Sequence, residues 1–206
     1  MGRLGAIVLR GGLSRRMGRP KDRLRLGDES LLERVARQLS RLTDPIVVVS
    51  AIDQDPPLLS CPVILAHDAV PGQGPLEGLA AGLRALPEDV ELAYATSVDA
   101  PFLVAAVIER LTDRLGDHDL AIPFARGRYH PLSAVYRVAT SLPAVESLLG
   151  AGRFRMSAVV DSLRTRVVGE AELRVLDPEL VTLRNINTPE DYALAARELP
   201  SVPDTF

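Results

Sequence analysis

Near the N-terminus, a glycine-rich basic segment has the residue types of a phosphate-binding loop. Gly11 and Gly12 follow the apolar run Gly5–Arg10, which predicts a buried strand. Two adjacent glycines can adopt positive φ, so several backbone N–H groups can converge on phosphate oxygens. Arg16 and Lys21 can then neutralise the phosphate charge. The alternative is a glycine turn with a basic surface loop, since neither a Walker A loop nor a G-x-G-x-x-G fingerprint is present.

Positive charge is concentrated around the same segment, in a chain that is otherwise acidic. Residues 1–25 hold eight basic residues against Asp22, a local charge of +7, so the overall net charge of −3 leaves −10 for the remainder. Lys21 is the only lysine among 24 basic residues. A local cationic patch favours a small polyanion over a nucleic acid, which usually needs a broader basic face. Four Tyr, four Phe and no Trp also provide few stacking platforms for single-stranded nucleic acid.

A second segment suited to a nucleotide runs from Asp68 to the block G-P-L-E-G-L-A-A-G-L at residues 74–83. Glycines where a strand passes into a helix let a flat ligand lie close to the backbone. Gly78 could serve a nucleotide in this way. The alternative is that Gly78 and Gly82 only allow the helix to pack tightly.

An aspartate at the end of a predicted strand is a candidate metal ligand. Asp99 follows the strand Leu92–Thr96 in the block D-A-P-F, where Pro101 fixes the turn. Mg²⁺ is commonly held by one or two carboxylates together with phosphate oxygens, and a carboxylate in this position can supply that ligand. An isolated aspartate would more often be a helix cap or a turn residue.

Strands and helices alternate along the chain, and the functional segments follow strands. The pattern predicts strands at Gly5–Arg10, Ile46–Val49, Val63–Ala66, Leu92–Thr96, Leu120–Pro123 and Leu132–Tyr136, and helices at Ser30–Leu42, Pro75–Leu86, Val104–Leu115 and from Thr188 onward. This alternation predicts an α/β fold, a three-layer, mostly parallel, Rossmann-like sheet with helices on both faces. Ligands of such sheets bind at the carboxyl ends of the strands. We expect a single domain over residues 1–199 and a frayed tail at 200–206.

The composition excludes several classes of protein. At 47% hydrophobic and 25% charged residues, the 206-residue chain is typical of a globular domain. The single Cys61 excludes an internal disulfide and a cysteine-based zinc site. The apolar run Phe102–Ile108 is too short to span a membrane, and the N-terminus enters a strand without a signal peptide. We therefore expect a cytoplasmic protein that binds neither membrane nor nucleic acid.

The N-terminal segment resembles the MobA-like nucleotidyltransferases, whose pattern there is L-x-G-G-x-S-x-R-M-G-x-x-K. The chain matches this pattern at Leu9, Gly11, Gly12, Ser14, Arg16, Met17, Gly18 and Lys21. Later blocks are also similar to the family, namely G-P-L-x-G-x-x-x-G-L, D-x-P-F, H-P-L and N-I-N-T-P-E-D. The double glycine looks like that of the members that use GTP, the molybdenum cofactor guanylyltransferases. The resemblance implies the nucleotide-diphospho-sugar transferase-like variant of the fold.

The resemblance also implies a reaction, the transfer of GMP from GTP to the terminal phosphate of molybdopterin or molybdenum cofactor, with release of pyrophosphate. Lys21, Arg16 and Asp99 would be catalytic, and Asp99 would bind Mg²⁺. Asp68 would accept hydrogen bonds from guanine N1–H and N2–H₂. The nucleotide would contact Leu9, Arg10, Gly11, Gly12, Ser14, Lys21, Asp68, Gly78 and Asp99. Cofactor-delivery proteins are expected as further partners.

The acceptor site is implied in the C-terminal half, at His130, Arg153, Asn185 and Asn187. Each has an alternative role, because His130 could satisfy a turn, Arg153 could be a solvated surface residue, and Thr188–Asp191 has the pattern of a helix cap whatever else it does.

The chain departs from the family pattern at two positions. Arg10 occupies a place that is usually Ala, and Ile52 one that is commonly Asn. Alternative functions therefore remain: a related nucleotidyltransferase that uses CTP or another phosphate acceptor, or a non-catalytic nucleotide-binding homologue.

Overall fold

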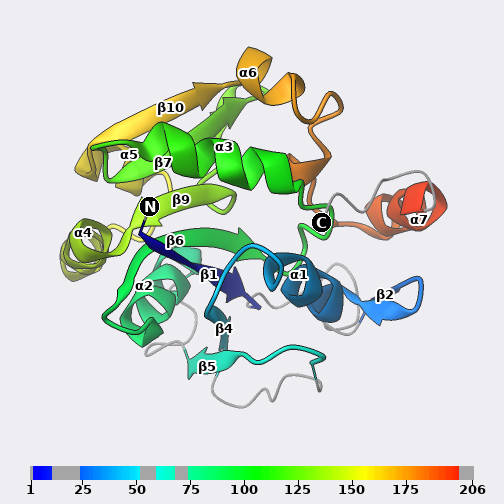
Figure 1. Cartoon of the computed structure of the whole chain (residues 1–206), viewed down its shortest axis with the longest axis horizontal. Helices are drawn as coiled ribbons and strands as arrows, with labels where there is room; N and C mark the ends of the chain where they lie inside the picture. Colours follow the sequence, from blue (N-terminus) through cyan, green and yellow to red (C-terminus); the bar gives the residue numbers. More distant parts are fainter. Residues whose placement is uncertain (1, 11–23, 52–58, 68–73, 200–206) are drawn as a thin grey trace.

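A mixed, mostly parallel sheet forms the centre of the molecule in the computed structural model, which describes residues 2–10, 24–51, 59–67 and 74–199 (Figure 1). Within these residues the strand order is β10-β7-β9-β6-β1-β4-β5, and β8 pairs with β7. The strands are β1 (Arg3–Leu9), β4 (Ile46–Ser50), β5 (Ile64–His67), β6 (Val90–Ser97), β7 (Leu120–Ala125), β8 (Arg128–Tyr129), β9 (Ala134–Arg137) and β10 (Thr165–Gly169). A separate hairpin joins β2 (Arg25–Leu26) to β3 (Glu29–Ser30).

Most neighbouring strands run parallel, and β9 is the main exception. It lies between β6 and β7 and is antiparallel to both, so β6 and β7 point in the same direction. The carboxyl ends of β1, β4, β5, β6, β7 and β10 therefore lie along one edge of the sheet. The predicted mostly parallel α/β architecture is confirmed.

Helices cover both faces of this sheet, which makes three layers. The helices are α1 (Leu31–Leu39), α2 (Pro75–Ala85), α3 (Ala105–Leu115), α4 (Val138–Gly150), α5 (Ala158–Ser162), α6 (Glu170–Arg174) and α7 (Pro189–Glu198), with a short 3₁₀ turn η2 (Val181–Leu183). Buried side chains of α1, α3 and α6 share one apolar core with Val8 and Tyr94. Those of α2, α4 and α5 share a second core with Ile7 and Ala95 on the opposite face. Alternate residues of β1 thus supply both cores, as a strand buried on both sides requires.

Local sequence explains how the helices begin. Ser30 accepts a hydrogen bond from the Glu33 N–H at 3.2 Å, and the Glu33 carboxylate accepts one from the Ser30 N–H at 2.7 Å, a capping box that starts α1. Thr188 and Asp191 start α7 in the same way, with the Thr188 N–H 2.9 Å from the Asp191 carboxylate. The capping expected of Thr188–Asp191 is confirmed.

Gly82 explains how closely α2 approaches the sheet. A Cβ at this position would lie 2.4 Å from Cγ2 of Ile7 on β1. Tight packing, the alternative considered for the glycines of α2, is therefore the role of Gly82.

The structure also differs from the predicted elements. The helix expected over Ser30–Leu42 ends at Leu39, and the strand expected at Leu132–Tyr136 is β9, displaced by one or two residues and antiparallel. None of α4, α5, β10 and α6 was expected. None of the helices in the described part of the chain combines the length and hydropathy that a membrane crossing requires.

Candidate active site

The end of β1 and the end of β6 lie side by side at the carboxyl edge of the sheet. Leu9 pairs with Ser97, and the Val98 N–H donates to the Leu9 carbonyl at 3.0 Å. On the other side of β1, the Arg10 N–H donates to the Val49 carbonyl at 2.8 Å. The chain therefore enters the double-glycine segment from the same edge that carries Asp99. Gly11, Gly12, Ser14, Arg16 and Lys21 themselves lie outside the described residues.

Asp99 is held in a turn by contacts from two directions. The Ser97 hydroxyl lies 2.5 Å from Oδ1 of Asp99 and donates to it, and the Ala100 N–H donates to the Ser97 carbonyl at 3.1 Å. The Asp99 carbonyl accepts a hydrogen bond from the Ile186 N–H at 2.7 Å. The turn at the end of β6 is thus tied to the strand before it and to a segment near the C-terminus. Ser97 was not predicted, because a serine near an aspartate is too common to be informative.

The donor set at this edge fits Mg²⁺ bound together with a nucleotide. Asp99 is a partly exposed carboxylate at the edge where phosphates are expected. The described residues contain no group of three or more His, Cys, Asp or Glu side chains that could hold a metal ion by themselves. A cation at Asp99 can complete its shell with phosphate oxygens, which is a coordination that Mg²⁺ commonly adopts.

Arg10, which departs from the family pattern, is buried at this edge. The residue is 6% exposed and directly follows β1. The Arg10 side chain is thus enclosed by protein at the point where the glycine segment begins. Ile52, the other departure, lies outside the described residues.

The N-terminus of α2 meets the same edge, because α2 follows β5. Gly74 precedes the helix with a φ of +88°, which favours glycine, and Pro75 occupies its first position. Gly78 is buried in the helix. The first turn of a helix presents free backbone N–H groups and attracts anions. Asp68, the predicted guanine contact, lies outside the described residues.

His130 directly follows β8, and its N–H donates to the Pro123 carbonyl of β7 at 3.0 Å. The residue is 8% exposed, and Nε2 of its ring lies 3.2 Å from the Ala125 carbonyl. Burial lowers the pKa of His130, so its ring is neutral at pH 7 and Nε2–H donates to that carbonyl. This hydrogen bond satisfies the turn, which is the alternative role that the sequence offers for His130. The contact of His130 with an acceptor stays a prediction.

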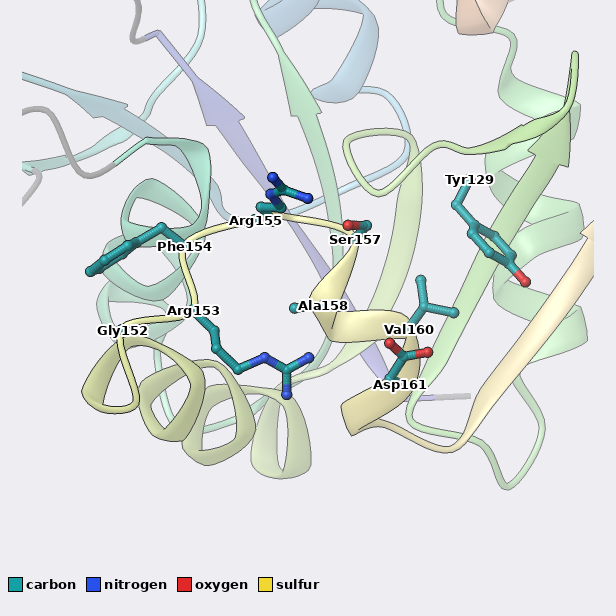
Figure 2. Close-up of a pocket in the computed structure, with 9 residues that line it drawn as sticks. All are labelled: Tyr129, Gly152, Arg153, Phe154, Arg155, Ser157, Ala158, Val160 and Asp161. Carbon is teal, nitrogen blue, oxygen red and sulfur yellow. The ribbon is translucent and has the colours of Figure 1, made fainter.

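A pocket of about 670 Å³ lies beside Arg153. The loop between α4 and α5 forms one side of it, and Tyr129 of β8 lies across from that loop (Figure 2). Arg153 extends toward α5, whereas Phe154 points away from it. Arg153 and Arg155 are both exposed and line the pocket, so it can receive an anion.

The structure brings Asn185 and Asn187 close to Asp99. Both are exposed and flank Ile186, whose N–H donates to the Asp99 carbonyl. The candidate metal ligand and two predicted acceptor residues therefore belong to one neighbourhood, although they are far apart in the sequence.

Comparison with known proteins agrees with this geometry. The model of the MobA-like NTP transferase domain matches residues 6–166. The chain belongs to the MobA-like NTP transferase family. A probable molybdenum cofactor guanylyltransferase of Mycobacterium tuberculosis is 38% identical over 190 residues, 90% of this chain and 89% of that protein. The molybdenum cofactor guanylyltransferase of Desulfosudis oleivorans is 35% identical over 191 residues, 92% of each.

Solved structures confirm the nucleotide-diphospho-sugar transferase fold. Molybdopterin-guanine dinucleotide biosynthesis protein A from Archaeoglobus fulgidus matches with a TM-score of 0.78 at 24% identity, over 96% of this chain and 99% of its own. 2-C-methyl-D-erythritol 4-phosphate cytidylyltransferase from Thermus thermophilus matches with a TM-score of 0.70 at 17% identity, over 94% and 98%. The MobA-like domain includes Asp99, His130 and Arg153, whereas Asn185 and Asn187 lie beyond its match at residue 166.

Proposed function

We propose that this MobA-like chain transfers GMP from GTP to the terminal phosphate of molybdopterin or molybdenum cofactor, releasing pyrophosphate and forming the guanine dinucleotide cofactor. The observation that carries the proposal is the pairing of Leu9 with Ser97, which joins the start of the double-glycine segment to Asp99 at one edge. The guanylyltransferase names of relatives that cover about nine tenths of the chain support the choice of GTP.

Nucleotidyl transfer depends mainly on positioning and charge neutralisation. The backbone of Gly11 and Gly12 holds the triphosphate, and Lys21 and Arg16 offset the charge that develops on it. Asp99, oriented by Ser97, is the protein ligand for Mg²⁺. When bound, Mg²⁺ neutralises charge on the phosphates and aligns them. Leu9, Ser14, Asp68 and Gly78 position the remainder of the nucleotide.

Two groups of residues are candidates for acceptor contacts, those that line the pocket and those of the Asn185–Asn187 segment. Arg153 and Arg155 supply positive charge for an anionic substrate. The exposed side chains of Asn185 and Asn187 flank the residue bonded to Asp99, where they can contact the acceptor phosphate. A phosphate monoester is already ionised at neutral pH, so the attack on the α-phosphorus requires no general base.

The test is pyrophosphate release from GTP with Mg²⁺, measured with and without molybdopterin. The proposal predicts release that requires both molybdopterin and Mg²⁺ and that is much slower with CTP or ATP. Preference for CTP would assign the chain to a cytidylyl reaction, and nucleotide binding without turnover would assign it a non-catalytic role. The proposal further places the reaction in the cytoplasm, with separate proteins that deliver the acceptor and collect the product.

A further inference from the structure

The segment that leads to Asn185 runs antiparallel beside the loop that follows Asp99, and three contacts join them in register. The Thr182 hydroxyl accepts a hydrogen bond from the Val104 N–H at 3.3 Å. The guanidinium carbon of Arg184 lies 4.8 Å from the centroid of the Phe102 ring. The Ile186 N–H donates to the Asp99 carbonyl at 2.7 Å. The Asp99 loop is therefore supported along its length by this C-terminal segment.

Both ends of this arrangement are anchored. Asp177 is 4% exposed, and its carboxylate accepts hydrogen bonds from the Val181 and Thr182 N–H groups, each at 2.9 Å. On the loop side, Phe102 is 1% exposed and fully enclosed in the core that includes α1. A shift of the ring would therefore disturb the core, and a shift of the segment would break the contacts of Asp177.

Arg34 of α1 is a second arginine on the same loop. Its guanidinium carbon lies 5.9 Å from the Phe102 centroid, and Nε donates to the Pro101 carbonyl at 3.0 Å. Cations over an aromatic face are attracted by its negative charge density, most strongly where water is excluded. Phe102 thus connects α1, the Asp99 loop and the C-terminal segment.

The Arg184 guanidinium has two partners, the Phe102 ring and Glu198 of α7. Its Nη2 atom is buried and has no hydrogen-bond partner in the described part of the chain. The other terminal nitrogen, Nη1, forms an ion pair with Glu198 of α7 at 2.6 Å. A buried guanidinium nitrogen without a hydrogen bond costs free energy, and contact with the face of Phe102 offsets part of that cost.

We propose that Arg184 is a positioning residue for the metal site. Through Phe102, and through the backbone of Ile186, it holds Asp99 where Mg²⁺ and the phosphates of GTP need it. The same contact keeps the acceptor segment Asn185–Asn187 in a fixed relation to the metal ligand. The inference rests on the proposed function, because it takes Asp99 as the ligand for Mg²⁺. Changes behind a metal ligand commonly weaken metal binding by about 10- to 100-fold.

Two substitutions of Arg184 test this role. Arg184→Met keeps a long unbranched side chain and removes the guanidinium, whereas Arg184→Lys keeps a cation that can reach the ring. The direct readout is Mn²⁺ binding in the presence of GTP, followed by electron paramagnetic resonance, together with the Mg²⁺ concentration for half-maximal pyrophosphate release. We expect Arg184→Met to weaken both about tenfold or more, and Arg184→Lys to restore part of the loss.

Two controls separate this role from general destabilisation. Arg84→Met removes an exposed ion pair with Glu146, far from the metal site, and should bind Mn²⁺ like the unaltered protein. Glu198→Gln breaks only the pair with α7 and should also leave metal binding nearly unchanged. If Glu198→Gln weakens Mn²⁺ binding as much as Arg184→Met, the effect passes through α7 and the proposal is overturned.

Asp99→Asn distinguishes failure of this inference from failure of the proposed function. If Asp99→Asn binds Mn²⁺ and GTP normally, Asp99 is not the metal ligand and the proposed site is wrong. If Asp99→Asn loses Mn²⁺ while Arg184→Met binds it like the unaltered protein, only the positioning role of Arg184 is refuted.

Discussion

Ser97→Ala removes the hydrogen bond from the Ser97 hydroxyl to a carboxylate oxygen of Asp99, and its effect can be worked out from the structure. The Ser97 hydroxyl donates to Oδ1 of Asp99 at 2.5 Å, and Ser97 is 9% exposed. A hydrogen bond to a charged group contributes about 1.5–3 kcal/mol. About 1.4 kcal/mol corresponds to a factor of ten. If most of that energy orients the carboxylate, Ser97→Ala should weaken binding of Mg²⁺ about 10- to 100-fold.

The assay is the Mg²⁺ dependence of pyrophosphate release, with thermal unfolding of the same variant as a measure of stability. Ser141→Ala is a matched control, because Ser141 is also buried and donates to a carbonyl, that of Asp119, at 3.4 Å, but lies on α4 away from the carboxyl edge. Ser141→Ala should leave the Mg²⁺ dependence unchanged. An unchanged Mg²⁺ dependence in Ser97→Ala would refute the reasoning that Ser97 orients a metal ligand.

Three further outcomes are expected. Gly82→Ala should lower the free energy of unfolding by about 1–3 kcal/mol, since its Cβ would collide with Ile7. The measurement is urea unfolding, and the control is Gly150→Ala, because a Cβ at Gly150 meets no atom within 4 Å. Equal stability of the two variants would contradict the packing argument. Burial lowers the pKa of His130 below 6.5, so the unfolded chain binds this proton more tightly. The stability that neutral His130 contributes is thus complete above pH 6.5. It is lost as the pH falls toward the folded-state pKa, by up to about 1.4 kcal/mol for each unit by which that pKa is lowered. His130→Gln should reduce this loss of stability between pH 7.5 and 5, and a pH profile identical to that of the unaltered protein would count against a buried neutral His130. Asp68→Asn should raise the rate with CTP relative to GTP, and an unchanged ratio would remove Asp68 from base recognition.

The sequence predicts the central strands and the edge that holds the site, because both depend on local patterns. Runs such as Ile46–Val49 are apolar throughout, as strands buried on both faces must be. The block that begins with Asp99 follows such a strand, so its place at the carboxyl edge follows from the parallel order alone.

Other elements depend on contacts that no local pattern shows. Pro143 lies inside α4 and usually indicates a helix end, so this helix is not expected from sequence. The direction of β9 is set by its pairing with β6 and β7, and an apolar run is the same in either direction. The five-residue elements α5, β10 and α6 are too short to show a clear period.

The candidate site likewise has features that the sequence predicts and features that only the structure shows. The position of Asp99 is predictable, whereas its hydrogen bond from Ser97 is a matter of side-chain geometry. Four strands separate Phe102 from Arg184 in the sequence, and only the folded chain brings the two residues together. For His130, the family-like block predicts a contact with the acceptor, and the structure shows a contact of the ring with the Ala125 carbonyl. The contact with the acceptor stays a prediction.

In the proposed function, the double-glycine segment and Asp99 together hold the triphosphate of GTP through a divalent cation. A crystal structure of the protein with GTP and Mg²⁺ tests it most directly. We expect the metal ion on the Asp99 carboxylate, with the phosphates between it and the backbone of Gly11 and Gly12. A nucleotide bound at another edge of the sheet, or a metal ion with no ligand from Asp99, would contradict it.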